Sequence, residues 1–470
     1  MSDTNEPLLK EAKKSSFPLT PFLAITISGL AFSFSTQFLS SNLPFITKQF
    51  IPDIKDEEIG YYSGYLTSMY FAGNIPGSIL IGYIADHFGR RPCYLFVLIS
   101  FLLCILLFGY TTNYTLALII RVFWGIADGY LGLSKTIVSE ICDDSNVAMG
   151  FSLFQFGMGF GSLIGPIAGG YLSQINSYWP QLITAFPFLK DSPFFVPCIF
   201  CGLFIFISII ITYFYLPETL KKEPKINGTD IETVQKETVR APTYKELFHS
   251  KEVFLSILSY GFLSICQSTY DAIIPLWLLN PTEYHGFRFI QTDISWIFTC
   301  SGVFQIITIG AIFPYMSQLF TYKKQYIFYG IVYGLIYAFN PIASLVNQDT
   351  FWLVPSNSVV SMYRAQVNGL GQVVGSIFRF IGPSLGSSLF AWSCTNNLSF
   401  PLHYGFTFYI SFLFYSLSIY IVFNYLYTFS KYNYMYNKYV FLTIYIIAII
   451  AVINSFTSLL LPDSINCQKV

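Results

Sequence analysis

Long apolar segments alternate with short polar segments along almost the whole chain. In the first half they lie at about 20–46, 60–84, 93–110, 115–140, 147–172 and 193–215. Segments of about 20 apolar residues are long enough to cross the hydrocarbon core of a bilayer as helices. They are also longer and more continuous than the strands of a membrane β-barrel, the other structure that satisfies its backbone in lipid. The pattern therefore predicts an all-α membrane protein that crosses the bilayer many times.

A second series of apolar segments follows a polar stretch, and its spans are expected near 252–279, 293–314, 325–346, 366–392, 404–425 and 439–461. Lys323 and Lys324 precede the third of these, where the first series has Arg90 and Arg91. This correspondence predicts two six-helix-type bundles with about 12 transmembrane helices. The expected parts are a cytoplasmic tail (1–17), an N-terminal bundle (18–216), a cytoplasmic linker (217–251), a C-terminal bundle (252–425) and an extra transmembrane segment with a tail (426–470).

The tenth span is atypical. Between about 347 and 365 the apolar run extends only from Phe351 to Tyr363. That run would make about 20 Å of helix, whereas a hydrocarbon core is about 30 Å thick. Either this is a broken, half-length span, or the topology of the second half is unusual, or the gene model has lost an exon.

Composition agrees with the membrane prediction, because 54% of the residues are hydrophobic and only 11% are charged. Soluble domains carry about 25% charged residues. The net charge is zero, which indicates no nucleic-acid partner, and the four histidines show no metal-ligand spacing. We find no nucleotide-binding loop and no nucleophile constellation. The expected partners are lipid and a small solute, with no cofactor, no metal and no enzymatic activity.

The N-terminal tail carries Lys10, Lys13 and Lys14, which predicts a cytoplasmic N-terminus by the positive-inside rule. Glu6-Pro7-Leu8-Leu9 is typical of an acidic dileucine signal for vacuoles or lysosomes, although a plain disordered tail explains it as well. The protein is therefore expected in a vacuolar or lysosomal membrane or in the plasma membrane.

A polar turn at 85–92 separates the second and third spans. The residues that give this turn its character are Gly82, Asp86, Gly89, Arg90 and Arg91. Because apolar segments of about twenty residues flank it on both sides, we interpret it as a tight charged turn at the membrane surface.

Span four carries Arg121, Asp128 and Lys135 at intervals of seven. A straight helix drifts by only about 20° per heptad, so these residues are expected near one face. Charged residues inside a span usually face the bundle interior or a water-filled cavity. Asp128 is either a carrier of the coupling proton or a permanent counter-ion of Arg121 or Lys135.

The second half offers matching groups. Asp271, beside Tyr270 on span seven, is a candidate proton carrier or a structural acid. Arg379 on span eleven either binds an anionic substrate group or pairs with Asp271. Gln37 on span one either supplies a neutral hydrogen bond to the substrate or only packs against neighbouring helices.

Small residues and one proline mark span five: Gly161, Gly165, Pro166, Gly169 and Gly170. They predict either a bendable helix, kinked where Pro166 removes a backbone bond, or simple close packing.

Four motifs in order resemble those of the major facilitator superfamily. The turn Gly82-x-x-x-Asp86-x-x-Gly89-Arg90-Arg91 matches the family's hallmark loop residue by residue. The other three are Arg121-x-x-x-Gly125-x-x-x-Gly129, Gly161-Ser-Leu-Ile-Gly165-Pro166-Ile-Ala-Gly169-Gly170 and Leu216-Pro217-Glu218-Thr219. The resemblance implies the facilitator fold. It also implies that the turn is a cytoplasmic gate, with Asp86 at the N-terminus of a facing helix and Arg90 paired with Glu140. It further implies that the kink of span five seals a leak path.

The chain is more closely similar to the zinc-induced-facilitator-like group of drug:proton antiporters, over about 20–425. The carrying stretches include Ser139-Glu140-Ile-Cys142, Tyr270-Asp271 and Asn368-Gly369-Leu370. The plant members have Cys- and His-bearing cytosolic motifs that are missing here, so zinc handling is not implied.

The resemblance implies a secondary active transporter of a small organic or metal-chelating solute, proton-coupled and working by alternating access, as a monomer. The alternatives are an uncoupled facilitator and a non-transporting relative such as a receptor or an inactive paralogue.

Overall fold

The computed structural model describes residues 18–143, 146–220, 251–282, 286–307, 372–396 and 402–429, with the single positions 315, 319, 334 and 340. Every regular element in these ranges is a helix. Within these ranges, six stretches are long and apolar enough to cross a membrane: Leu19–Phe50, Arg90–Tyr110, Tyr114–Ile141, Met149–Leu172, Phe195–Tyr215 and Ile257–Leu279. The prediction of an all-α membrane architecture is confirmed.

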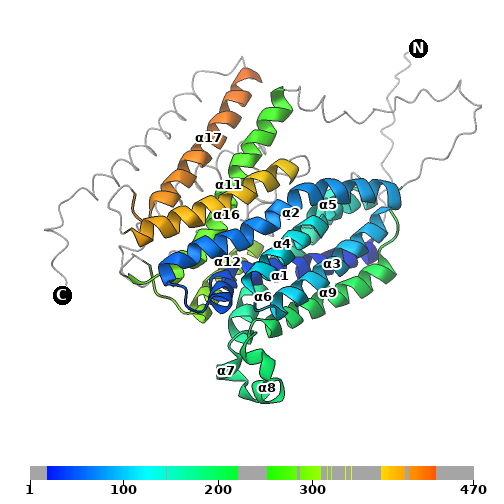
Figure 1. Ribbon diagram of the computed structural model, residues 1–470. Helices are drawn as coiled ribbons and strands as arrows, with labels where there is room; N and C mark the ends of the chain where they lie inside the picture. The colour runs from blue at the N-terminus through cyan, green and yellow to red at the C-terminus, as the bar shows by residue number, and fades with distance from the viewer. Residues whose placement is uncertain are drawn as a thin grey trace, which may run out of the picture.

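The first half is a bundle of long helices lying side by side (Figure 1). They are α1 (Leu19–Phe50), α2 (Ile59–Phe88), α3 (Arg90–Tyr110), α4 (Tyr114–Ala127), α5 (Tyr130–Ile141), α6 (Val147–Leu172) and α9 (Phe195–Tyr215). Four short elements, of which α7 and α8 project together beyond the bundle in Figure 1, are η1 (Asp56–Glu58), α7 (Ile175–Tyr178), α8 (Pro180–Ala185) and η2 (Pro187–Lys190).

The described helices of the second half are α11 (Lys251–Leu279), α12 (Gln291–Ile307), α16 (Gln372–Thr395) and α17 (Phe406–Phe429). In Figure 1, α16 runs beside α2, and α11 and α17 lie next to each other. Five predicted features lie wholly or mostly outside the described residues: the tail 1–17, the linker 217–251, and the segments 325–346, 347–365 and 439–461. The division into domains stays a prediction.

Two predictions of local structure are wrong. The polar turn is not eight residues long, because α2 continues to Phe88 and α3 begins at Arg90, so Gly89 alone lies between them. Span four is not one straight helix, because it is interrupted at Asp128 and Gly129. Both differences have long-range causes, which the site geometry makes clear.

Glycines let α6 approach α1 closely. A methyl group on Gly161 or Gly165 would meet the backbone of Leu30 or Phe34 across the interface. Small residues at such positions allow helix backbones to come close, which strengthens packing where lipid supplies no hydrophobic drive.

Among the described helices, the pairs α2–α16 and α6–α12 pack most extensively between the halves. A methyl group on Gly60 or Gly64 of α2 would meet Ser387 of α16, and one on Gly170 of α6 would meet Ser295 of α12. These contacts lie toward the end of the molecule where α12 begins, which we call the Gln291 end. The opposite end, where α2 passes into α3, is called the Gly89 end.

Candidate functional site

A cavity of about 690 Å³ lies between the two halves and reaches the Gly89 end. The charged side chains that line it in the described part of the chain are Asp86, Arg90, Arg121, Asp128, Lys135, Asp271 and Arg379. Gln37 lines it from α1. The structure thus brings the predicted pathway residues to one cavity, with one exception. Tyr270 is 2% exposed and lies in the apolar core of the second half, where its hydroxyl accepts a hydrogen bond from Asn340 Nδ2 at 3.1 Å.

Asp128 lies at the interruption of span four and is 7% exposed. Its Oδ2 accepts a hydrogen bond from the Tyr70 hydroxyl, and its Oδ1 accepts one from the Tyr130 backbone N–H at 2.9 Å. Its own carbonyl oxygen accepts a hydrogen bond from Asn74 Nδ2 at 2.7 Å. Partners from α2 and α5 therefore satisfy the groups that the broken helix leaves free, as buried polar groups require.

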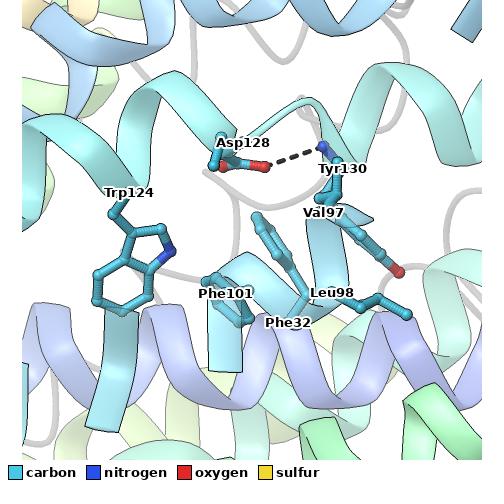
Figure 2. A pocket seen from close by; sticks show the side chains of 8 residues that line it. Phe32, Val97, Leu98, Phe101, Trp124, Asp128 and Tyr130 are labelled. Carbon is cyan, nitrogen blue, oxygen red and sulfur yellow. Dashed lines mark hydrogen bonds between the residues drawn. The ribbon is translucent and has the colours of Figure 1, made fainter. Parts of the chain in front are cut away.

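Apolar rings pack beneath this carboxylate. Figure 2 shows Asp128 at the gap between α4 and α5, with the rings of Phe32, Phe101 and Trp124 below it. The rings of Phe101 and Trp124 lie edge to face, with centroids 5.0 Å apart. One side of Asp128 is thus closed by packed side chains, and the cavity lies on another.

Arg121 is held by carbonyl and ring contacts. Its Nε donates to the Leu66 carbonyl oxygen at 3.1 Å, and its Cζ lies 4.9 Å from the Tyr70 ring centroid and 5.3 Å from that of Trp124. Cation–π attraction of this kind stabilises a desolvated guanidinium. Among the described residues no ion pair joins Asp128 to Arg121 or Lys135, so the geometry does not support the counter-ion interpretation.

The acid and the cation of the second half are directed to different partners. Asp271 Oδ1 accepts a hydrogen bond from Gln267 Nε2 at 2.8 Å, one turn earlier on α11. Arg379 Nη2 on α16 donates to the Tyr260 hydroxyl at 2.9 Å. The predicted pairing of Arg379 with Asp271 is not among the ion pairs of the described residues.

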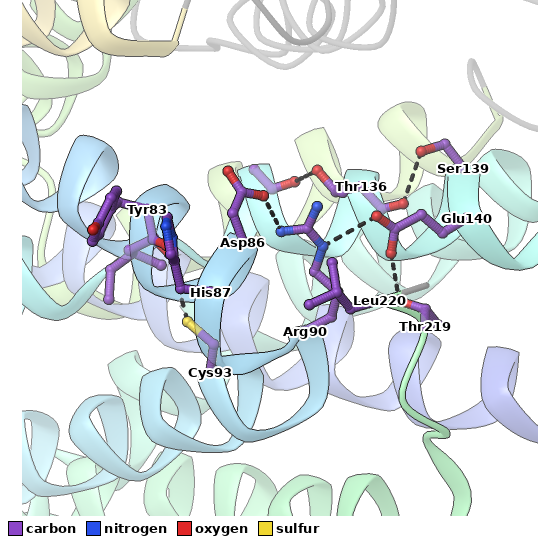
Figure 3. Close-up of polar contacts among 12 residues, drawn as sticks. Tyr83, Asp86, His87, Arg90, Cys93, Thr136, Ser139, Glu140, Thr219 and Leu220 are labelled. Carbon is purple, nitrogen blue, oxygen red and sulfur yellow. Dashed lines mark hydrogen bonds and ion pairs between the residues drawn. The ribbon is translucent and has the colours of Figure 1, made fainter. Parts of the chain in front are cut away.

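An ion-pair network joins the helices of the first half at the Gly89 end (Figure 3). Arg90 lies between two acids, with Nη1 2.5 Å from Asp86 Oδ1 and Nε 3.1 Å from Glu140 Oε1. The Thr219 hydroxyl, just beyond α9, donates to the other oxygen of Glu140. The predicted pair of Arg90 and Glu140 is therefore present, and it ties α2, α3 and α5 to the segment after α9. We call Asp86, Arg90, Glu140, Glu218 and Thr219 the latch.

Glu218 and Thr219 are the two members of the latch that sequence reasoning missed as site residues. Glu218 Oε1 accepts a hydrogen bond from the Arg90 backbone N–H at 2.8 Å, and its Oε2 accepts one from that of Arg91 at 3.2 Å. Partial burial alone would raise the pKa of the Glu218 carboxyl. The hydrogen bonds from the backbone N–H groups of Leu220, Arg90 and Arg91 together have the larger, opposite effect, so the pKa is lowered. A carboxylate at a helix N-terminus satisfies orphan donors and complements the helix dipole.

The place predicted for Asp86, at the N-terminus of a facing second-half helix, stays a prediction, because the residues that precede Gln372 in span eleven lie outside the described residues. Glu218, and not Asp86, occupies the N-terminus of α3, whereas Asp86 lies in α2 and pairs with Arg90, the first residue of α3. The signal in the sequence was the motif Leu216-Pro217-Glu218-Thr219, in which one acid follows span six. Arg91 faces away from the latch acids, because its guanidinium donates to the Tyr213 carbonyl oxygen and lies over the Tyr213 ring.

The glycine-rich face of α6 is a packing surface. Gly161, Gly165 and Gly169 lie against α1, whereas Gly170 lies against α12 of the other half, and Pro166 is inside the helix. This geometry supports the packing interpretation, and a role of Pro166 in sealing a leak path stays a prediction. In the described part of the chain no three His, Cys, Asp or Glu side chains gather in a way that could hold a metal ion.

Comparison with known proteins agrees with this architecture. The family model "Major Facilitator Superfamily" matches residues 25–383. Protein ZINC INDUCED FACILITATOR-LIKE 1 of Arabidopsis thaliana is 25% identical over 408 residues, covering 80% of this chain and 85% of that protein. The major facilitator-type transporter psiT2 of Psilocybe cyanescens is 25% identical over 449 residues, covering 79% of this chain and 85% of that protein.

The fold is also that of a solved structure, the xylose transporter XylE from E. coli in a partially occluded inward-open conformation. The TM-score is 0.63 at 17% identity, and the alignment covers 87% of this chain and 99% of that chain. With the family match over more than half of its length, this chain belongs to the major facilitator superfamily and is an integral, multi-pass membrane transporter.

Proposed function

We propose that the protein is a proton-coupled secondary active transporter in which Asp128 carries the coupling proton. Its substrate is a small organic or metal-chelating solute, in line with the similarity to a zinc-induced facilitator-like protein. It acts as a monomer by alternating access. Its N-terminus and the Gly89 end are cytoplasmic, in a vacuolar or lysosomal membrane or in the plasma membrane.

The surroundings of Asp128 carry the proposal. The carboxylate is 7% exposed, lines the cavity, and receives hydrogen bonds from a hydroxyl and a backbone amide rather than from a cation. A buried carboxylate without a cationic partner bears a large desolvation cost in its charged form. Binding a proton removes that cost and breaks no ion pair, and Tyr70 can turn its hydroxyl to accept from the protonated acid.

The contacts between the halves support the alternating-access part. At the Gln291 end, Gln291 Nε2 donates to Asn42 Oδ1 and to Ser173 Oγ, both at 2.6 Å, and so joins α12 to the first half. At the other end the cavity reaches Gly82 and Asp86. This arrangement suits a state in which the binding site faces the Gly89 end. Transporters of this type change access by rocking one bundle against the other.

The test is transport by the full-length protein in sealed vesicles, screened over organic anions, amines and chelators with and without an imposed pH gradient. Asp128→Asn should lose accumulation driven by the gradient, by about tenfold or more, while exchange of substrate without a gradient continues. Asp293→Asn is the matched control, because Asp293 lies in the first turn of α12, outside the cavity lining, and accepts from the Ile290 backbone N–H. Wild-type uptake that ignores the gradient would favour an uncoupled facilitator, and an Asp128→Asn variant with full gradient dependence would exclude this carboxylate.

A further inference from the structure

Lys135 and Arg379 face the cavity from opposite halves of the molecule, with no acidic partner among the described residues. Lys135 comes from α5 and Arg379 from α16, and both line the cavity. Within the described part of the chain neither forms an ion pair, and Arg379 uses one Nη2–H bond to reach the Tyr260 hydroxyl. Both therefore place positive charge in the same cavity between the halves. Like charges held together without an anion are unfavourable unless something else neutralises them.

The other charged groups of the cavity are already engaged. Arg90 is neutralised by Asp86 and Glu140, and Arg121 is enclosed by aromatic rings and the Leu66 carbonyl. Asp128 accepts from Tyr70 and Tyr130. Asp271 lies about 16 Å along α11 from Tyr260, at about 1.5 Å per residue, and therefore far from the Arg379 guanidinium. The charge still available to a ligand near Tyr260 is thus positive.

A neighbouring hydroxyl independently indicates a ligand. Ser264 is 2% exposed and lines the cavity, and its Oγ has no hydrogen-bond partner among the residues that the structure describes. It lies one turn beyond Tyr260 on α11, and Gly375 of α16 faces both residues, since a methyl group there would lie 2.7 Å from Tyr260 Cε1 and 3.3 Å from Ser264 Oγ. A buried hydroxyl left unpaired costs about 1–3 kcal/mol, so a polar group that reaches it would be bound favourably.

We infer that Lys135 and Arg379 bind the anionic group of a small organic substrate, a carboxylate, sulfonate or phosphate, with the Ser264 hydroxyl as an added donor. The inference rests on the transporter function proposed above and names the substrate class. Arg379 supplies planar, paired N–H donors suited to such an oxyanion, and Lys135 supplies a point charge.

The site is separate from the proton carrier. Lys135 lies in α5, about 7.5 Å along the helix from Tyr130 at about 1.5 Å per residue, and nearer the Gly89 end than Asp128 does. The organic part of the substrate then extends toward Asp128. Because the two cations sit in opposite halves and repel each other, an anion between them favours approach of α5 and α16. Substrate binding at this site would thereby promote closure of the Gly89 end.

The experiment measures binding to the purified full-length protein in detergent, with no membrane gradient. Its readouts are the thermal unfolding midpoint and the Kd for benzoate and for sulfate. Benzamide and equal ionic strength of chloride serve as the uncharged and the non-specific comparisons. We expect benzoate and sulfate to raise the midpoint of the wild type. Lys135→Gln and Arg379→Gln should each weaken Kd by about tenfold or more, as loss of a charge-assisted hydrogen bond does.

Two further variants separate binding from folding. Lys135→Arg keeps the charge and should retain binding, and Lys190→Gln removes an exposed lysine of η2 outside the cavity and should change nothing. The proposal is overturned if the wild type shows no anion-specific shift, if benzamide acts like benzoate, or if both Gln variants bind as the wild type does. Failure of proton coupling in vesicles would leave these binding results unchanged, so the two proposals fail separately.

Discussion

Among single residues, Gly89 determines how α2 passes into α3. Its φ of 114° and ψ of 153° belong to a backbone region that residues other than glycine almost never adopt. A methyl group there would also lie 2.5 Å from Glu218 Oε2 and 3.0 Å from Glu218 Cδ. The glycine therefore has two functions. It allows the chain to reverse direction between α2 and α3, and it leaves space for the Glu218 carboxylate that caps α3.

We expect Gly89→Ala to lower the free energy of unfolding by about 1–3 kcal/mol through backbone strain, and more if Glu218 is displaced. Gly82→Ala is the matched control, because a methyl group on Gly82 meets nothing within 4 Å and alanine favours a helix. Chemical unfolding of both variants in detergent checks this. Equal stability of the two variants would show that the conformation of Gly89 is not required.

Glu218 gives the latch a defined pH dependence. The pKa of its carboxyl is lowered from 4.5 in the folded protein. Its stabilising effect is therefore fully present above about pH 4.5, the unfolded value, and is lost as the pH falls through the lower folded value. Glu218→Ala should cost about 1 kcal/mol near pH 7, as loss of a helix cap does, and progressively less in acid. Unfolding midpoints of wild type and variant from pH 3 to 7 measure the difference, and a difference that grows in acid would contradict the assignment.

Among the elements, the interruption of span four shapes the cavity. Gly129 lies against Ile81 of α2, and a methyl group there would meet the Ile81 side chain, with its Cβ 2.7 Å away. The start of α5 is further fixed by a buried hydroxyl cluster, in which Tyr94 Oη lies 2.6 Å from Ser28 Oγ and 3.2 Å from Ser134 Oγ. The break is thus held between α2 on one side and α1 and α3 on the other.

Gly129→Ala should push α5 away from α2 and lower the free energy of unfolding by about 1–3 kcal/mol, the usual cost of overpacking. It should also weaken gradient-driven uptake, because Asp128 would lose its fixed geometry. Gly132→Ala, three residues on, meets nothing within 4 Å and should be neutral or stabilising by up to about 1 kcal/mol. Unfolding and uptake of the two variants form the measurement. A Gly132→Ala variant as impaired as Gly129→Ala would point to helix propensity rather than to the contact with Ile81.

The helices differ in how well the sequence predicts them. Most ends of the described long helices could be predicted to within a few residues, because the thickness of the bilayer fixes the length of an apolar segment that crosses it. The break at Asp128 could not, since its cause is the hydrogen bonds that Tyr70 and Asn74 supply from α2. Likewise, the ion pair of Arg90 with Glu140 followed from the motifs, whereas the capping role of Glu218 depends on where the chain after α9 passes α3.

At the scale of the whole molecule, a few polar contacts add to the helix packing that joins the two halves. Asn74 on α2 donates to the Asp128 carbonyl oxygen and accepts from the Ser376 hydroxyl on α16 at 2.7 Å, so it connects the broken span to the second half. Gln291 makes the corresponding connection at its own end. Such contacts bias a two-state equilibrium by their free energy in one state only.

Gln291→Ala should therefore populate the state that opens at the Gln291 end. Loss of about 1 kcal/mol or more from its two hydrogen bonds corresponds to at least a roughly fivefold shift. The measurement is the labelling rate of a cysteine placed at Thr67, which lines the cavity, by a membrane-impermeant thiol reagent applied to each side of oriented vesicles. Gln49→Ala is the matched control, because Gln49 donates to the Asp191 carbonyl oxygen at 3.1 Å within the first half. We expect labelling from the Gln291 side to rise in Gln291→Ala and to stay unchanged in Gln49→Ala. An equal rise in both variants would mean that this end opens through local loosening rather than through separation of the two halves.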